Sequence, residues 1–144
     1  MRTATMGKVI VTAKIENLND LLNASQGLLP PEQVRSVEVT DALVDTGATM
    51  LSLPKRLVTQ LGLQPVRTRQ ARTSAGPVTV QVYHMVRLTV QGRDWGGEAT
   101  EVPDDCPVLI GQIPLEGLDF VVDPINGRLI GNPAHGGEHI IELY

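Results

Sequence analysis

One short stretch constrains the chain most: residues 43–49, with the sequence Leu-Val-Asp-Thr-Gly-Ala-Thr. An apolar run, expected to be a strand, leads directly into the carboxylate of Asp45, which is followed by the hydroxyl of Thr46 and then by Gly47. A strand that ends in this way delivers an acid to a tight turn, and the small residues that follow keep bulk away from it. The pattern is compatible with an ordinary turn, since Asp and Gly are both turn residues, but it is also a way to build a catalytic carboxylate.

The composition favours a mostly β fold in a single domain that spans residues 1–144. A chain of this length can form one domain with a modest core. Its 14 Gly and 10 Pro indicate many turns and short elements. Aromatic residues make up only 3% of the chain, so we expect an aliphatic core built from Val, Leu and Ile.

Charge, hydropathy and cysteine content argue against several classes of function. The formal net charge is -4 and the basic residues are scattered, so we expect no nucleic-acid partner. No run of about 18 apolar residues is present, so we expect no membrane span. Residues 1–6 lack the apolar core of a signal peptide. Cys106 is the only cysteine, which excludes an intrachain disulfide and fits a reducing compartment, so we expect a cytoplasmic protein.

Alternating and β-branched runs predict strands along most of the chain. Strands are expected at residues 8–15, 33–39, 41–44, 66–71, 78–83, 85–90, 119–123, 128–130 and 140–144. The second strand is expected to pair back on the first. Turn residues at 73–77 and the Asn-Gly pair at 126–127 predict two further hairpins. The polar, Gly-containing stretch at residues 95–105 is expected to be a loop.

Helix signals are few. Residues 54–61 predict a helix, because Pro54 suits the first helical position and Gly62 suits the residue after the end. Residues 112–118 are expected to form one helical turn. A second short turn is expected at residues 18–22, within a long connection. The sequence therefore predicts one short helix as the main helical element.

Three motifs resemble those of the retropepsin-like aspartic proteases, which include the retroviral proteases and their bacterial and eukaryotic relatives. Residues 44–49, with Leu-Pro at 53–54, resemble the active-site segment of this family. Residues 108–111, Val-Leu-Ile-Gly, resemble its second signature, which packs beside the active-site loop. Residues 72–83 occupy the place of the flap, a hairpin that closes over substrate. The resemblance covers residues 8–130.

The resemblance implies a small closed β-barrel with one short helix and the activity of an aspartic endopeptidase. Aspartic proteolysis uses two carboxylates about 3 Å apart that share one proton, so that one activates water as a base and the other protonates the peptide carbonyl oxygen. This chain contains one Asp-Thr-Gly. We therefore expect a homodimer in which Asp45 of each subunit forms the catalytic pair. By resemblance, Thr46 bonds across the two-fold axis and Gly47 lets its backbone approach the carboxylate.

The substrate that the resemblance implies is an extended polypeptide, bound as a strand beneath the flap. The residues expected to line its site are Ala48, Thr49, Ser74, Ala75, Gly76 and Ile110. Residues 140–144 are a candidate for pairing between subunits, and no metal or organic cofactor is expected. An alternative stays open, in which a retropepsin-fold domain binds peptides or dimerises without cutting, because fold does not fix function.

Two features depart from the retroviral members of the family. Gly111 is followed by Gln112, where those members carry an arginine that braces the subunit interface. The expected flap tip at residues 74–77 is less Gly-rich than a retroviral flap. Both departures bear on dimer strength and flap motion more than on the chemistry.

The remaining candidate sites have simpler interpretations. Residues 135–139 match the zinc-peptidase pattern His-x-x-Glu-His, but two consecutive glycines would cost the required helix about 2 kcal/mol. A glycine loop before a final strand is expected there instead. His84 is expected to be an ordinary strand residue. Cys106 follows Asp104 and Asp105, which disfavour a thiolate, so a structural thiol is expected.

Overall fold

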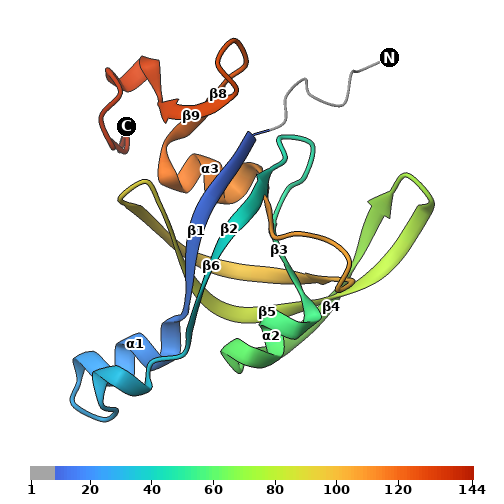
Figure 1. The fold of residues 1–144 in the computed structure, drawn as a ribbon, viewed down its shortest axis with the longest axis vertical. Helices are drawn as coiled ribbons and strands as arrows, with labels where there is room; N and C mark the ends of the chain where they lie inside the picture. The colour runs from blue at the N-terminus through green and yellow to red at the C-terminus, as the bar shows by residue number, and fades with distance from the viewer. Residues whose placement is uncertain (1–8) are drawn as a thin grey trace.

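A computed structural model describes residues 9–144 of the chain (Figure 1). The elements follow in the order β1 (Val9–Asn17), α1 (Leu18–Ser25), β2 (Ser36–Val44), β3 (Leu51–Pro54), α2 (Lys55–Leu61), β4 (Gln64–Thr73), β5 (Gly76–Val90), β6 (Arg93–Val102), β7 (Leu109–Ile110), α3 (Gln112–Leu118), β8 (Phe120–Asp123) and β9 (Arg128–Gly131). The mostly β fold is confirmed. The first residue of the predicted opening strand and the N-terminal residues 1–6 lie outside the described residues.

Seven of the strands form one sheet, in the order β1-β2-β7-β3-β6-β5-β4. β1 pairs antiparallel with β2 and also with β5, so the pairings pass through the sheet and return to the first strand. β4 lies outside this ring of pairings, and the β4–β5 hairpin projects from the body of the molecule (Figure 1). β8 and β9 form a separate two-stranded sheet beside α3.

The core of the described chain is aliphatic, as predicted. Its largest fully buried side chains are Ile15, Leu51, Leu53, Leu61, Leu88, Ile110, Leu118, Val9, Val44, Val82, Val86 and Val90. Burying a side chain of this size stabilises a fold by about 1.5–3 kcal/mol relative to exposure. The strands that surround the Asp45 turn contribute several of these side chains, so the turn rests on a packed base.

Several local predictions are confirmed. The helix expected at residues 54–61 is α2, and Gly62 ends it in the left-handed conformation with a φ of 63°. Both expected hairpins form, as β4–β5 and as β8–β9. Three α-helices are present in the described chain, where one main helix was expected. None of the helices in residues 9–144 is long and apolar enough to cross a membrane.

Two predictions about where strands and loops lie are wrong. The polar stretch at residues 95–105, expected to be a loop, belongs largely to β6. β6 pairs parallel with β3 and antiparallel with β5, so backbone hydrogen bonds on both edges hold a strand whose side chains give little hydrophobic signal. Residues 78–83 and 85–90, expected to be separate strands, form the single long strand β5.

The prediction of a last strand at residues 140–144 is also wrong for the single chain. These residues have no regular secondary structure. A strand needs a partner edge, and no strand in residues 9–144 pairs with them. The apolar side chains of this segment are exposed instead, including Ile141, Leu143 and Tyr144.

Asp119 ties the segment before this tail to the body of the molecule. Its carboxylate accepts hydrogen bonds from His135 Nδ1 at 2.6 Å, from Asn132 Nδ2 at 3.2 Å and from the backbone N–H of Ile140 at 3.2 Å. These bonds, with that of His135 the strongest, lower the pKa of Asp119 to about 2. Asp119 in turn raises the pKa of His135, with a smaller contribution from Glu142.

We predict that His135→Asn removes a pH-dependent part of the stability. The pKa of His135 is raised in the folded state, so its contribution is full below its unfolded value of 6.5 and declines as the pH rises through the folded pKa. The pKa of Asp119 is lowered, so its contribution is full above 3.8 and is lost as the pH falls through about 2. The melting temperatures of wild type and variant should differ most between pH 3.8 and pH 6.5, the pKa values of the two groups in the unfolded chain. The difference should be smaller in alkaline buffer.

The control is His139→Asn, which removes a histidine that contacts the backbone carbonyl of Gly117 and no carboxylate. It should not show this pH-dependent difference. A difference for His135→Asn that widens as the pH rises above 6.5 would contradict the assignment.

The start of α3 packs tightly against the loop between β2 and β3. A Cβ atom at residue 111 would lie 2.5 Å from the carbonyl oxygen of Met50 and 2.6 Å from that of Ala48. Both are backbone atoms, which cannot rotate away. Glycine is required here by this close approach, since the φ of Gly111 is an ordinary -91°.

We therefore predict that Gly111→Ala destabilises the fold by roughly 1–3 kcal/mol, because the loop and α3 must move apart. Urea unfolding would measure the change in the free energy of unfolding. The control is Gly96→Ala, whose added Cβ would meet the end of the flexible Leu18 side chain at 3.4 Å. Equal stability of Gly111→Ala and wild type would contradict the close packing.

Candidate active site

Asp45 lies directly after β2, at the start of the loop that leads to β3. The preceding residue, Val44, is buried and pairs with Ile110 of β7, whereas Asp45 is partly exposed. The backbone N–H of Asp45 donates to the carbonyl oxygen of Ile110 at 2.9 Å. The buried end of the strand therefore fixes the backbone of Asp45 at the point where its side chain reaches the surface.

The loop places small residues around this carboxylate. The backbone N–H of Gly47 donates to Asp45 Oδ1 at 2.9 Å, which orients the carboxylate. A Cβ atom at residue 47 would lie 3.2 Å from the same oxygen, so glycine leaves that side open. Thr46 is exposed, and its hydroxyl makes no hydrogen bond within residues 9–144. The loop thus presents a carboxylate and a free hydroxyl on one surface.

The second motif, residues 108–111, lies between the two strands that flank the loop. β7 pairs parallel with β2 and antiparallel with β3. Ile110 sits at the centre of this arrangement and is 0% exposed. The apolar character of the motif is explained by this position, which is buried beneath the Asp45 loop.

The first turn of α3 also binds the loop. The backbone N–H groups of Gln112 and Ile113 donate to the carbonyl oxygens of Ala48 and Thr49, both at 2.9 Å. The N–H groups that begin a helix lack partners within it, so the loop satisfies them. The side-chain amide of Gln112 donates to the carbonyl oxygen of Thr46 at 2.8 Å.

The contact of Gln112 with the loop is a role that the sequence did not reveal. The resemblance to the retroviral proteases marks Gln112 only as a replacement for an arginine. In the structure it positions the backbone next to Asp45. The two residues that it joins are far apart along the chain, so no local spacing signals the contact.

A groove of about 520 Å³ lies beside the loop. One part of its lining is the loop itself, at residues 47–50, and another is the β4–β5 hairpin. Ser52 and Thr100, whose hydroxyls are 2.9 Å apart, are buried residues of this lining. An open groove between a carboxylate loop and a projecting hairpin has the form needed to hold an extended chain.

The structure brings only some of the expected lining residues together. Ala48 and Thr49 line the groove, next to Gly47. Residues 74–76 form the tip of the β4–β5 hairpin and are not part of the lining. Ile110 supports the loop from within the core and has no exposed surface in the single chain.

The hairpin contributes lining residues that were not among those expected to line the substrate site. These are Arg69, Gln70, Ala71, Arg72, Thr73, Val78 and Val80. The β-alternation of residues 78–83 indicates that alternate side chains share a face. It does not indicate which face lies toward the Asp45 loop, because that depends on how the hairpin is attached to the sheet.

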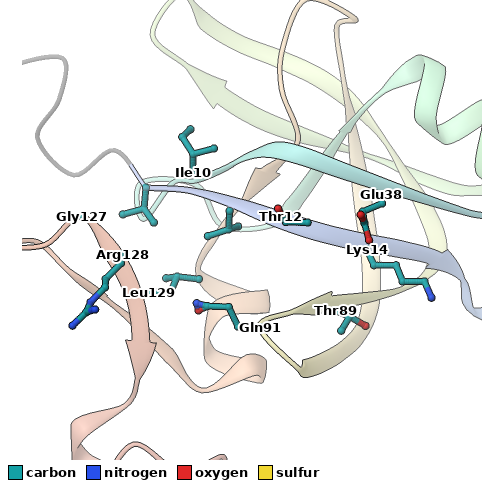
Figure 2. Close-up of a pocket in the computed structure, with 11 residues that line it drawn as sticks. Ile10, Thr12, Lys14, Glu38, Thr89, Gln91, Gly127, Arg128 and Leu129 are labelled. Atoms are coloured by element: carbon teal, nitrogen blue, oxygen red, sulfur yellow. The ribbon is translucent and has the colours of Figure 1, made fainter.

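A second hollow, of about 570 Å³, lies between β1, the β5–β6 turn and the β8–β9 hairpin (Figure 2). It includes none of the expected site residues. Its two basic lining residues pair with carboxylates, Lys14 with Glu16 and Arg128 with Asp123, each at 3.7 Å. No set of reactive groups converges there, so this hollow is not a competing catalytic site.

The other sequence candidates have local roles. Within residues 9–144 no group of three or more His, Cys, Asp or Glu side chains is placed to hold a metal ion. The His-x-x-Glu-His stretch begins in a 3-10 turn and continues without a helix. His84 belongs to β5, and its Nε2 lies 2.6 Å from Glu98 Oε2. Cys106 is a partly buried free thiol.

Comparison with known families agrees with this geometry. Residues 33–116, more than half of the chain, match the family model described as gag-polyprotein putative aspartyl protease. The matched span contains the Asp45 loop, the β4–β5 hairpin and β7. No curated protein matches the chain. The chain therefore belongs to the retropepsin-like family of gag-polyprotein aspartyl proteases, and its fold is that of a protease-like domain.

Proposed function

We propose that the chain is an aspartic endopeptidase that acts as a homodimer and hydrolyses peptide bonds in an extended polypeptide. The observation that carries this proposal is the Asp45 loop, fixed by Ile110 and α3 beside an open groove. The family match supports proteolysis in general terms. The dimer, the substrate and the roles of individual residues are parts of the proposal.

The chemistry requires two carboxylates. In the proposed dimer, the Asp45 pair shares one proton, because two like charges about 3 Å apart cannot both ionise. The ionised Asp45 takes a proton from a water molecule, whose oxygen attacks the peptide carbon. The protonated Asp45 gives its proton to the carbonyl oxygen. The tetrahedral intermediate then breaks its C–N bond, and the leaving nitrogen takes the proton that the first Asp45 accepted from water. One hydroxyl of the intermediate returns its proton to the other Asp45 as the carboxylic acid product forms, which restores the pair.

The neighbours of Asp45 have positioning roles in this scheme. The N–H of Gly47 orients one carboxylate oxygen. We propose that Thr46 bonds across the two-fold axis, and its exposed hydroxyl, without a partner in the described chain, supports this role. Gln112 holds the backbone of Thr46 from α3.

The barrel and the flap complete the proposal. The pairing of β1 with both β2 and β5 supports a small closed barrel. The hairpin β4–β5 acts as the flap, and residues 74–76 at its tip approach the substrate only when the hairpin moves over the groove. Substrate bound along the groove adds an extended strand beneath this hairpin.

We predict that Asp45→Asn abolishes cleavage of an unfolded protein substrate. The amide has almost the same shape, but it cannot accept or donate the catalytic proton, so the rate should fall by at least about 10²–10⁴-fold. Gel-based cleavage from acidic to neutral pH, with and without an aspartic-protease inhibitor, would measure the loss. Size-exclusion chromatography should show that the dimer persists.

The control is Asp41→Asn, which removes an exposed carboxylate from the same strand, β2. It should retain activity. Undiminished cleavage by Asp45→Asn would contradict the proposal. A wild-type protein that binds peptides but cuts none would favour the non-catalytic alternative.

Residues 140–144 are the proposed site of pairing between subunits. Ile141 and Leu143 expose 76% and 78% of their surface in the single chain. Adjacent exposed apolar side chains typically mark an interaction surface. Their backbone has no strand partner within residues 9–144, so a second copy could supply one.

We predict that the double variant Ile141→Asp/Leu143→Asp is a folded monomer without proteolytic activity. Charged side chains would oppose burial at the interface. Both positions are exposed in the single chain, so its thermal stability should change little. Analytical ultracentrifugation would measure the assembly. The control is Ile125→Asp, at a residue that is 90% exposed in the β8–β9 turn. A double variant that stays dimeric would contradict the proposed role of residues 140–144.

A further inference from the structure

Two arginine residues belong to the lining of the groove next to the Asp45 loop. Arg69 and Arg72, both on β4, are exposed and belong to the groove lining. Neither forms a salt bridge or a side-chain hydrogen bond with another residue in the part of the chain that the structure describes. Both charges are therefore available to a bound molecule.

The register of the hairpin shows which face carries Arg69. Arg69 pairs directly with Val80, so the two side chains lie on the same face. Val82, two residues further along β5, is on that face too and is fully buried in the core. Arg69 therefore lies on the inward face of the hairpin, above the groove.

The arginine nearest to Arg69 on that face has a different environment. Arg67 forms a salt bridge with Glu98, and this bond lowers the pKa of the Glu98 carboxyl. His84 binds the other oxygen of the same carboxylate. Arg67 is therefore neutralised within the chain, whereas Arg69 is not.

The groove lining contains one acidic residue, Glu101, and its carboxylate is already engaged. The hydroxyl of Tyr83 donates to Glu101 Oε1 at 2.6 Å. Burial, together with this bond, raises the pKa of Tyr83 to about 12, so the donor stays protonated in neutral solution. Arg72, three residues from Arg69 on β4, lies on the opposite face of the hairpin. The inward face therefore presents one free cation, Arg69, and the acidic residue of the lining is already engaged.

We propose that Arg69 selects polypeptide substrates that carry an Asp or Glu side chain in the segment bound in the groove. This inference rests on the proposed function, because it names the substrate class of the same site. A guanidinium group binds a carboxylate through two parallel hydrogen bonds, which fixes its orientation as well as its charge.

The first experiment measures binding, so that it does not depend on turnover. The full-length protein with Asp45→Asn is titrated with fluorescently labelled, unstructured peptides, and the anisotropy is recorded. Each peptide carries one Glu at a different position and has a partner with Gln at that position. At the position that meets Arg69, the Glu peptide should bind about fivefold more tightly than its Gln partner. Added salt should reduce this preference.

Variants at one residue then assign the preference. In the Asp45→Asn background, Arg69→Gln should abolish the preference for Glu, and Arg69→Lys should retain part of it. Arg69→Glu should reverse it, in favour of a further peptide that carries Lys at the same position. The matched control is Arg128→Gln, which removes the same charge from β9, away from the groove. It should leave the ratio of Glu to Gln affinities unchanged.

The cleavage assay separates this inference from the proposed function. With Asp45 intact, kcat/KM for Glu and Gln peptides should show the same ratio and the same loss in Arg69→Gln. Binding that follows Arg69 without any cleavage by wild type would overturn the proposed function and support the inference. Three results would overturn the inference. The first is cleavage or binding that does not distinguish Glu from Gln at any position. The second is a preference that survives Arg69→Gln, and the third is the absence of any peptide binding.

Discussion

The candidate site depends on one backbone hydrogen bond, from the N–H of Asp45 to the carbonyl oxygen of Ile110 at 2.9 Å. It joins two sequence motifs that lie far apart along the chain and fixes the carboxylate relative to the core. Further bonds from Gln112 and Ile113 to the same loop reinforce it. Paired carboxylate chemistry needs positions held to within about 0.5 Å, and a loop without these bonds could not provide that.

The two sides of the groove differ in how they are supported. The Asp45 loop stands on fully buried aliphatic side chains, among them Leu51 and Ile110. The β4 strand is exposed along almost its whole length and is held mainly by its backbone pairing with β5. In the proposed enzyme, this difference would divide the tasks of chemistry and substrate capture between a rigid loop and a more loosely supported hairpin.

Much of the fold could be predicted from the sequence because its signals are local. Gly62 ends α2 and the Asn-Gly pair at residues 126–127 turns the β8–β9 hairpin, each through the backbone chemistry of a few residues. β6 could not be predicted in this way, because pairing on both edges holds its polar sequence in place. Residues 140–144 have the composition of a strand but lack a partner edge within the single chain. The placement of Arg69 above the groove required the register of the hairpin, which composition does not encode.

The central claim is that the Asp45 carboxylate is half of an active site. The most direct test is the distance between the two Asp45 carboxylates in a crystal structure of the assembled protein. The account predicts a two-fold axis between them and a separation of about 3 Å, as sharing one proton requires. A separation far beyond hydrogen-bond reach in every assembly of the chain would contradict it.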